Sequence, residues 1–225
     1  MVSEPAPPPR CQALLFDLDG TLADTAPDLA GALNALLCEL DRAPLPFATI
    51  RPHVSHGGRA LIKLGLGLED GDPDFKPLHR RFLDLYRDAI ARETRLFDGM
   101  EALLAQAEAH GVPWGVVTNK PAWLTDPLMD ELGLTGRAGC IVSGDTTAHS
   151  KPHPEPLLHA SRLVGIEPGD CLFVGDAERD IEAARRAGMY SLVARFGYLG
   201  PDDRPEYWGA DGLVDTPGEI AAWLA

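Results

Sequence analysis

Residues 14–21 read Leu-Leu-Phe-Asp-Leu-Asp-Gly-Thr, and this stretch decides the fold. The short apolar run at residues 13–16 is typical of a buried parallel strand, and Asp17 and Asp19 follow where the chain leaves it. Gly20 allows a tight turn at that point. Two carboxylates this close can bind a cation, or one can stay ionised while the other is protonated, so that they play different roles in a reaction. A calcium loop is less consistent, because the Glu expected at the end of an EF-hand loop is missing.

Further apolar runs predict more strands of the same sheet. They cover residues 112–118, 140–143, 171–174, 191–194 and, more weakly, 212–214. Between them, apolar residues recur at helical spacing over residues 100–109, 122–132, 155–164 and 178–187. This alternation predicts an α/β fold with a Rossmann-like open parallel sheet and right-handed crossovers. Ligands of such sheets bind beyond the carboxyl ends of the strands.

One interval lacks strand-like runs, and its pattern predicts helices over residues 27–40, 60–68 and 77–92. Thr25 and Asp28 resemble a capping pair at the start of the first helix. We therefore expect residues 24–95 to form a helical cap domain inserted after the first strand. Residues 11–23 and 96–225 would form the core. Residues 1–10 are rich in proline and predict a disordered tail rather than a signal peptide.

Composition narrows the class of partner. The chain has 225 residues, of which 45% are hydrophobic and 24% are charged, as in ordinary soluble proteins. The net charge of −14 argues against nucleic acid and anionic membranes as partners, because both require basic patches. No apolar run reaches the length of a membrane span, so we expect a cytoplasmic protein, either a monomer or a homodimer. The four cysteines contain no Cys-x-x-Cys pair, which indicates thiols in a reducing compartment.

Polar residues also follow the later strands. Thr118 and Asn119 follow the second strand, and Lys151 precedes a proline that opens a helix. Asp176 and Asp180 follow the fourth strand, four residues apart on one helix face. Each residue alone has an ordinary explanation, such as helix capping or a solvated lysine. Together they bring carboxylates, a hydroxyl and an ammonium to one sheet edge, which suits Mg²⁺ and a phosphoryl group.

The stretches LLFDLDGT, VVTNK, SKP and VGDAERD are similar, in this order, to the motifs of the haloacid dehalogenase superfamily, in its phosphatase branch. The resemblance covers nearly the whole chain. It implies a phosphoric monoester hydrolase that requires Mg²⁺ and carries a small helical cap. Asp19 favours a phosphatase over a dehalogenase, because a halide leaves without an acid and dehalogenases lack this second aspartate.

The resemblance also implies a role for each motif residue. Asp17 would attack phosphorus and become an aspartyl phosphate. Asp19 would protonate the leaving oxygen and then activate water. The phosphoryl group would be bound by Thr118, Asn119 and Lys151. The metal would be held by Asp17, the backbone carbonyl of Asp19, Asp176 and, in support, Asp180.

The predicted cap contains the loop HVSHGGR at residues 53–59. Gly57 and Gly58 permit close backbone approach, and Arg59 is either a clamp for a second anionic group or a surface residue. The loop resembles the specificity loop of phosphoglycolate phosphatases. The stretches SHGGRAL, LFDGM, WGVVTNKP and GYLGPDDRPEYWGAD resemble N-acetylmuramic acid 6-phosphate phosphatases of peptidoglycan recycling. We expect a small phosphorylated acid or sugar acid as substrate, with N-acetylmuramic acid 6-phosphate ahead of phosphoglycolate.

Other functions stay open on motifs alone. A phosphosugar mutase would keep the aspartyl phosphate but shield it from water. A receiver-like phosphoprotein fits less well, because receiver domains are shorter and lack a helical insert. His149 and His153 lie four residues apart, but the intervening proline and the lack of another soft ligand argue against zinc. The tail after Gly197, with Tyr207 and Trp208, either packs on the core or contacts substrate, and we favour packing.

Overall fold

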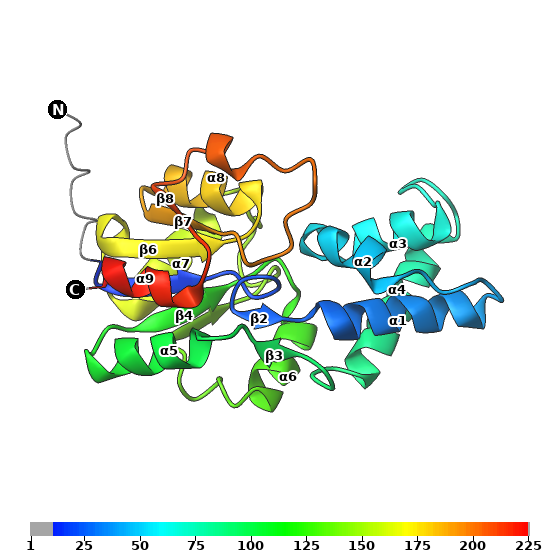
Figure 1. The fold of residues 1–225 in the computed structure, drawn as a ribbon, viewed down its shortest axis with the longest axis horizontal. Helices are drawn as coiled ribbons and strands as arrows, with labels where there is room; N and C mark the ends of the chain where they lie inside the picture. Colours follow the sequence, from blue (N-terminus) through cyan, green and yellow to red (C-terminus); the bar gives the residue numbers. More distant parts are fainter. Residues whose placement is uncertain (1–10, 225) are drawn as a thin grey trace.

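The structure, a computed structural model, describes residues 11–224, so the tail predicted for residues 1–10 lies outside the described residues. An open sheet of six parallel strands lies at its centre, in the order β5-β4-β1-β6-β7-β8 (Figure 1). The strands are β1 (Ala13–Phe16), β4 (Trp114–Val117), β5 (Cys140–Val142), β6 (Cys171–Gly175), β7 (Tyr190–Ala194) and β8 (Gly212–Val214). The predicted α/β class and open parallel sheet are confirmed, and the strand ends shift by at most two residues.

Helices cover both faces of the sheet, because alternate side chains of β1 are apolar on both sides. Leu14 and Phe16 pack in one cluster with side chains from α5, α6 and α9, whereas Ala13 and Leu15 pack in another with α7 and α8. Burial of each large apolar side chain stabilises the fold by roughly 1.5–3 kcal/mol. These helices are α5 (Met100–Ala109), α6 (Ala122–Glu131), α7 (Glu155–Val164), α8 (Glu178–Ala187) and α9 (Pro217–Ile220). Short 3₁₀ turns complete this part: η2 (Pro168–Asp170), η3 (Pro205–Tyr207) and η4 (Ala221–Trp223).

The segment between β1 and β4 contains four further helices, which lie beside the sheet (Figure 1). They are α1 (Ala26–Glu39), α2 (Phe47–Ile50), α3 (Gly57–Leu66) and α4 (Phe75–Asp88), with the 3₁₀ turn η1 (Arg51–His56). We call them the cap helices. They share an apolar cluster in which Leu33, Phe75, Phe82 and Tyr86 are fully buried. The sequence did not predict α2 or η1, since both are too short to show a helical period.

Two short strands join the cap helices to the rest of the chain. β2 (Ala23–Asp24) precedes α1, and β3 (Arg95–Leu96) follows α4. They pair antiparallel, with Ala23 opposite Leu96 and Asp24 opposite Arg95. The connection that leads into the cap helices and the one that leads back from them therefore run side by side in opposite directions.

The capping pair predicted at the start of α1 is wrong. The Thr25 hydroxyl does not cap the helix and instead donates to Asp19 Oδ1 at 2.6 Å. Asp28 accepts hydrogen bonds from the backbone N–H groups of Glu93 at 3.0 Å and Thr94 at 2.9 Å, and from the Thr94 hydroxyl at 2.7 Å. Thr25 therefore contacts the turn after β1, whereas Asp28 ties the start of α1 to the segment before β3, at least 65 residues away.

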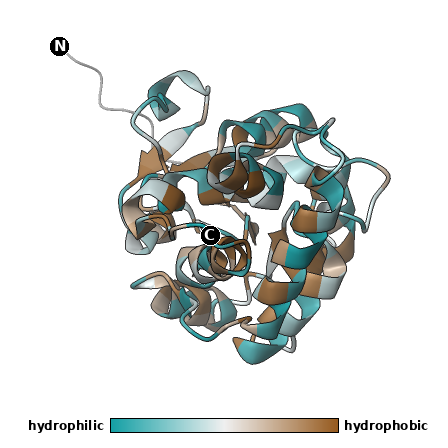
Figure 2. Cartoon of the chain, turned by 90° about the vertical axis from the view of Figure 1, so that its right-hand side faces the viewer, coloured by the Kyte–Doolittle hydropathy of each residue, from teal (hydrophilic) through white to brown (hydrophobic). Residues whose placement is uncertain are grey.

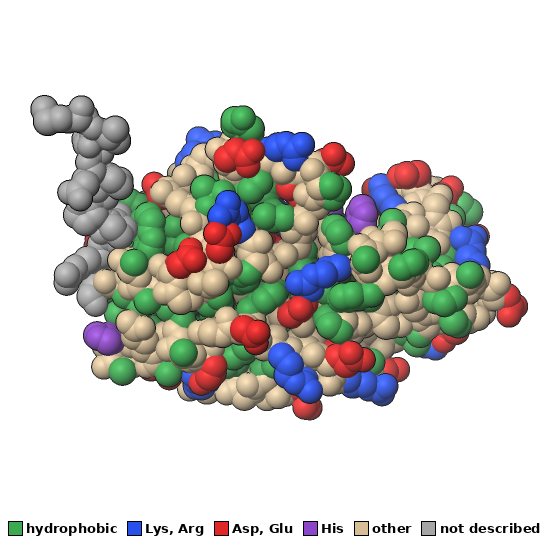
Figure 3. Space-filling view, viewed as in Figure 1, with side chains coloured by type: hydrophobic (Ala, Val, Ile, Leu, Met, Phe, Trp, Pro, Cys, Tyr) green, Lys and Arg blue, Asp and Glu red, His purple; other side chains and the backbone are tan. Residues whose placement is uncertain are grey.

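The distribution of hydrophobic and charged residues in the structure agrees with the ordinary composition of the chain. The helices carry hydrophobic and hydrophilic residues on different sides (Figure 2). Acidic and basic side chains are interspersed on the face drawn in Figure 3. Among the described residues, no helix has the length and apolar character needed to cross a membrane.

Candidate active site

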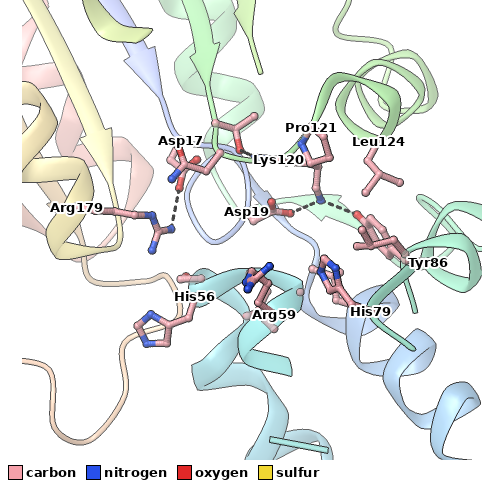
Figure 4. Close-up of a pocket in the computed structure, with 18 residues that line it drawn as sticks. Asp17, Asp19, His56, Arg59, His79, Tyr86, Lys120, Pro121, Leu124 and Arg179 are labelled. Carbon is pink, nitrogen blue, oxygen red and sulfur yellow. Dashed lines mark hydrogen bonds and ion pairs between the residues drawn. The ribbon is translucent and has the colours of Figure 1, made fainter. Parts of the chain in front are cut away.

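The carboxyl ends of the central strands bring the predicted polar residues together, and Figure 4 shows two of them, Asp17 and Asp19. Asp17 follows β1, Thr118 follows β4 and Asp176 follows β6, and all three are buried. They converge because β1 pairs with both β4 and β6. Gly20, with φ of +87°, turns the chain just after Asp19. A Cβ at Gly20 would lie 2.2 Å from Asp176 Oδ2, so only glycine fits this turn.

Asp17, Asp176 and Asp180 form a buried acidic cluster, with one carboxylate oxygen from each lying within 4.8 Å of the others. The Lys151 ammonium lies 2.9 Å from Asp17 Oδ1 and 2.8 Å from Asp180 Oδ1. It also donates to the Val117 carbonyl at 2.7 Å. The Lys151 side chain is fully buried, so both ion pairs are shielded from solvent.

Negative charge predominates in this cluster. Burial and the charges of Asp17 and Asp180 raise the pKa of Asp176 to about 7. Burial also raises the pKa of Asp180, although the Lys151 ammonium opposes that shift. Carboxylates that repel one another in a buried site suit a hard divalent cation, whose preferred ligands are oxygens. The donor set therefore fits a divalent metal ion.

Asp176 is also tied to the cap helices and to the C-terminal part of the chain. The Ser55 hydroxyl, on η1, donates to Asp176 Oδ2 at 2.6 Å, and the Tyr198 backbone N–H donates to the same oxygen at 2.9 Å. Sequence reasoning missed both contacts. The available signals were the positions of Ser55 within residues 53–59 and of Tyr198 within the stretch GYLGPDDRPEYWGAD.

Asp19 has a separate set of partners. The Lys120 ammonium lies 2.7 Å from Asp19 Oδ1 and 2.9 Å from the hydroxyl of Tyr86, on α4 (Figure 4). Burial acts to lower the pKa of Lys120, but the Asp19 charge and the hydrogen bonds outweigh it and raise that pKa above its usual range. Burial raises the pKa of Tyr86 to about 12, so its hydroxyl stays protonated. Lys120 belongs to the quoted VVTNK stretch, but sequence reasoning gave it no role.

Asn119 holds the segment that carries Lys151. Its side-chain N–H donates to the Lys151 carbonyl at 2.9 Å, and its Oδ1 accepts from the Lys151 N–H at 2.9 Å. The contacts that the structure gives this amide are thus to backbone. Asn119 also lines a pocket together with Asp17 and Asp19, so its predicted contact with phosphate stays a prediction.

A pocket of about 360 Å³ lies between the sheet edge and the cap helices (Figure 4). Asp17, Asp19 and Thr118 line it from the core, and the predicted specificity residues line it from α3: Gly57, Gly58 and Arg59. A Cβ at Gly58 would lie 3.0 Å from His79 Nε2, so glycine permits that close packing. The Arg59 guanidinium pairs with Asp70 at 2.8 Å and lies over the Phe75 ring, with its side chain 57% exposed.

Comparison with known proteins agrees with this geometry. Residues 14–194 match the haloacid dehalogenase-like hydrolase family. The chain belongs to this family.

Curated relatives of this hydrolase carry two names. An N-acetylmuramic acid 6-phosphate phosphatase of Pseudomonas aeruginosa is 44% identical over 94% of this chain and 93% of its own length. A phosphoglycolate phosphatase of Xanthomonas campestris pv. campestris is 43% identical over 94% of this chain and 97% of its own. A crystal structure of a predicted phosphoglycolate phosphatase from Haemophilus somnus aligns with a TM-score of 0.82 and 27% identity, over 93% of this chain and 96% of that one. The chain is a phosphoric monoester hydrolase, and its substrate is a phosphorylated small molecule.

A second cavity of this hydrolase, of about 230 Å³, lies beside Asp176. Arg179 and Trp208 both line it, and the Arg179 guanidinium also approaches Asp17 Oδ2 at 3.9 Å. The core-packing interpretation is wrong for Tyr207, whose surface is 81% exposed on the 3₁₀ turn η3. Sequence reasoning assigned Arg179 no role, although the residue lies between the two predicted acids of VGDAERD.

The predicted histidine pair has a third neighbour. His149 Nδ1 lies 2.7 Å from Glu155 Oε2, and the His149 and His153 rings are stacked with centroids 4.2 Å apart. Glu155 supplies a third possible ligand atom near the two histidines, but a carboxylate is not a soft ligand, so the argument against zinc stays a prediction. The group lies on the exposed side of the segment that carries Lys151.

Proposed function

We propose that this hydrolase is a Mg²⁺-dependent phosphatase that acts on N-acetylmuramic acid 6-phosphate through an aspartyl-phosphate intermediate. The observation that carries the substrate choice is the wall of the 360 Å³ pocket, which includes Leu29, Leu83 and Leu124 beside His79. Phosphoglycolate, a two-carbon acid, has no methyl group to cover these side chains. The sugar acid has an acetyl methyl and a lactyl methyl, and burial of each favours binding by about 0.8 kcal/mol.

Asp17 is the proposed nucleophile. Its Oδ1 accepts hydrogen bonds from the Leu18 N–H at 2.8 Å and has the Lys151 ammonium at 2.9 Å, which leaves Oδ2 on the side of Arg179. Attack by Oδ2 forms a bond to phosphorus as the bond between phosphorus and the sugar oxygen breaks. The Thr118 hydroxyl and Lys151 bind the phosphoryl oxygens, and Asn119 holds Lys151 in place.

Asp19 is the proposed acid and base. In the first step it gives its proton to the leaving sugar oxygen, which departs as an alcohol. In the second step it takes a proton from the water that attacks phosphorus, and the bond from Asp17 to phosphorus breaks. Inorganic phosphate is released, and both carboxyl groups return to their starting forms.

The Asp17 and Asp176 carboxylates and the Asp19 backbone carbonyl would hold Mg²⁺, with Asp180 in support. When bound, the ion neutralises charge on the transferring phosphoryl group. The structural support is the buried cluster of Asp17, Asp176 and Asp180, with one carboxylate oxygen from each within 4.8 Å of the others. Burial, together with the charges of Asp17 and Asp180, raises the pKa of Asp176.

Residues 24–95 would act as a cap that excludes water from the pocket, with hinges at residues 23–25 and 92–97. Their separate apolar cluster and the paired strands β2 and β3 support this division.

Phosphoglycolate is the alternative substrate. Arg59 could pair with the carboxylate of either compound, so it does not separate the two.

The test compares kcat/KM for N-acetylmuramic acid 6-phosphate and 2-phosphoglycolate, each with Mg²⁺ and with EDTA. We expect a strong preference for the sugar acid and loss of both activities in EDTA. Leu83→Ala should lower kcat/KM for the sugar acid and leave that for phosphoglycolate nearly unchanged. A preference for phosphoglycolate, or an equal effect of Leu83→Ala on both, would reject the proposed substrate.

A further inference from the structure

Lys120 is a buried cation to which the proposed reaction gives no task. Its side chain is only 6% exposed, and a charge so far from solvent is stable only when it is paired. Its ammonium lies 2.7 Å from Asp19 Oδ1 and 2.9 Å from the Tyr86 hydroxyl. Figure 4 shows Lys120 between these two side chains, at the boundary of core and cap helices.

The hydrogen bonds of Asp19 are unevenly distributed over its carboxylate. Lys120 and Thr25 both donate to Oδ1, and within residues 11–224 no side chain or backbone group donates to Oδ2. Fixing one oxygen fixes the rotation of the whole carboxylate. Oδ2 is then the oxygen that can carry the proton toward the leaving group, and proton transfer requires that oxygen to be well aimed.

Tyr86 connects this arrangement to the cap helices. Its ring is fully buried in their apolar cluster, and its hydroxyl reaches Lys120 across the boundary. Lys120 follows β4 of the core, 34 residues further along the chain. The ammonium is therefore held from two sides, by a core carboxylate and a cap hydroxyl.

We propose that Lys120 and Tyr86 are positioning residues for the acid–base step: Lys120 fixes Asp19 through Oδ1, and the Tyr86 hydroxyl fixes Lys120. The acid is then correctly aimed only when α4 is seated on the core. This inference rests on the proposed phosphatase mechanism. It concerns substrates whose leaving group is an alcohol, since those need a proton to depart.

The dependence on leaving group tests the inference. Tyr86→Phe removes the hydroxyl and keeps the buried ring. We expect it to lower kcat/KM for N-acetylmuramic acid 6-phosphate about tenfold, and Lys120→Met to lower it about a hundredfold. With 4-nitrophenyl phosphate, whose leaving group departs as a stable anion, both variants should stay within about threefold of wild type. The ratio kcat/KM is the right quantity, because it reports the steps up to leaving-group departure.

The control is Phe82→Leu, which loosens the same helix without touching Lys120. A structural effect of this kind should lower kcat/KM for the two substrates by the same factor. Equal losses for the two substrates in Tyr86→Phe would overturn the inference while leaving the proposed function intact. A wild-type protein that hydrolyses neither phosphate would overturn both. Thermal unfolding of each variant verifies that the fold is retained.

Discussion

Removal of divalent metal should make the stability of this protein depend on the ionisation of Asp176. Burial and the charges of Asp17 and Asp180 raise the pKa of this carboxyl from 3.8 to about 7 in the folded protein. A raised pKa means that the folded state prefers the protonated form. The stabilisation is therefore fully present below pH 3.8 and is lost as the pH rises through about 7.

The size of the effect follows from the shift. About three pKa units correspond to about 4 kcal/mol across the whole window, of which about 3 kcal/mol falls between pH 5 and pH 8. Asp176→Asn removes the titration and keeps an oxygen that can accept from Ser55 and Tyr198. In EDTA, wild type should therefore lose about 3 kcal/mol relative to Asp176→Asn between these two pH values.

Urea unfolding of both proteins in EDTA, at about pH 5 and about pH 8, measures this difference. Added Mg²⁺ at the higher pH should restore stability to wild type and much less to Asp176→Asn, because only wild type keeps the full donor set. A difference between the two proteins that is the same at both pH values would refute the reasoning. So would equal stabilisation of both by Mg²⁺.

Four further outcomes are expected. Asp17→Asn should reduce phosphate release by about a thousandfold or more with little change in the melting temperature; near-normal turnover would reject the nucleophile. Lys151→Met leaves buried carboxylates without their cation, so urea unfolding in EDTA should show a loss of about 3–5 kcal/mol, and an unchanged midpoint would contradict this. Asp28→Ala leaves the Thr94 N–H without its acceptor, so urea unfolding should show a free energy of unfolding lower by about 2 kcal/mol, and an unchanged value would contradict this. Arg59→Gln should raise KM for both candidate acids with kcat nearly constant; steady-state kinetics that show a fall in kcat alone would exclude a binding role.

The residues at the strand ends could be predicted from sequence because two simple rules act together. Apolar runs mark buried parallel strands, and the carboxyl ends of such strands meet at one edge. Asp17, Asp176 and Asp180 accordingly lie close to one another and to Lys151, and Thr118 lines the same pocket as Asp17. The functions assigned to them are predictions that the experiments above address.

Contacts across the boundary with the cap helices could not be predicted in this way. Ser55 and Asp176 are 121 residues apart, and no periodic pattern indicates that they touch. Thr25 and Asp28 have the right spacing for a helix cap, but Thr25 bonds to Asp19 and Asp28 bonds to Thr94, both outside the helix. How one apolar cluster packs against another depends on the shapes of the side chains, and a hydrophobic pattern in the sequence carries no information about those shapes.

The pairing of β2 with β3 has a consequence for how such a protein can change. The chain leaves the sheet side at Asp24 and returns opposite it at Arg95, so the backbone enters and leaves the intervening segment at one narrow place. If residues 24–95 act as the proposed cap, they form a module that a longer, shorter or differently shaped insert could replace while the strand order of the sheet stays the same. New specificity can arise by exchanging the module, but a new insert must also supply a hydroxyl where Tyr86 now meets Lys120.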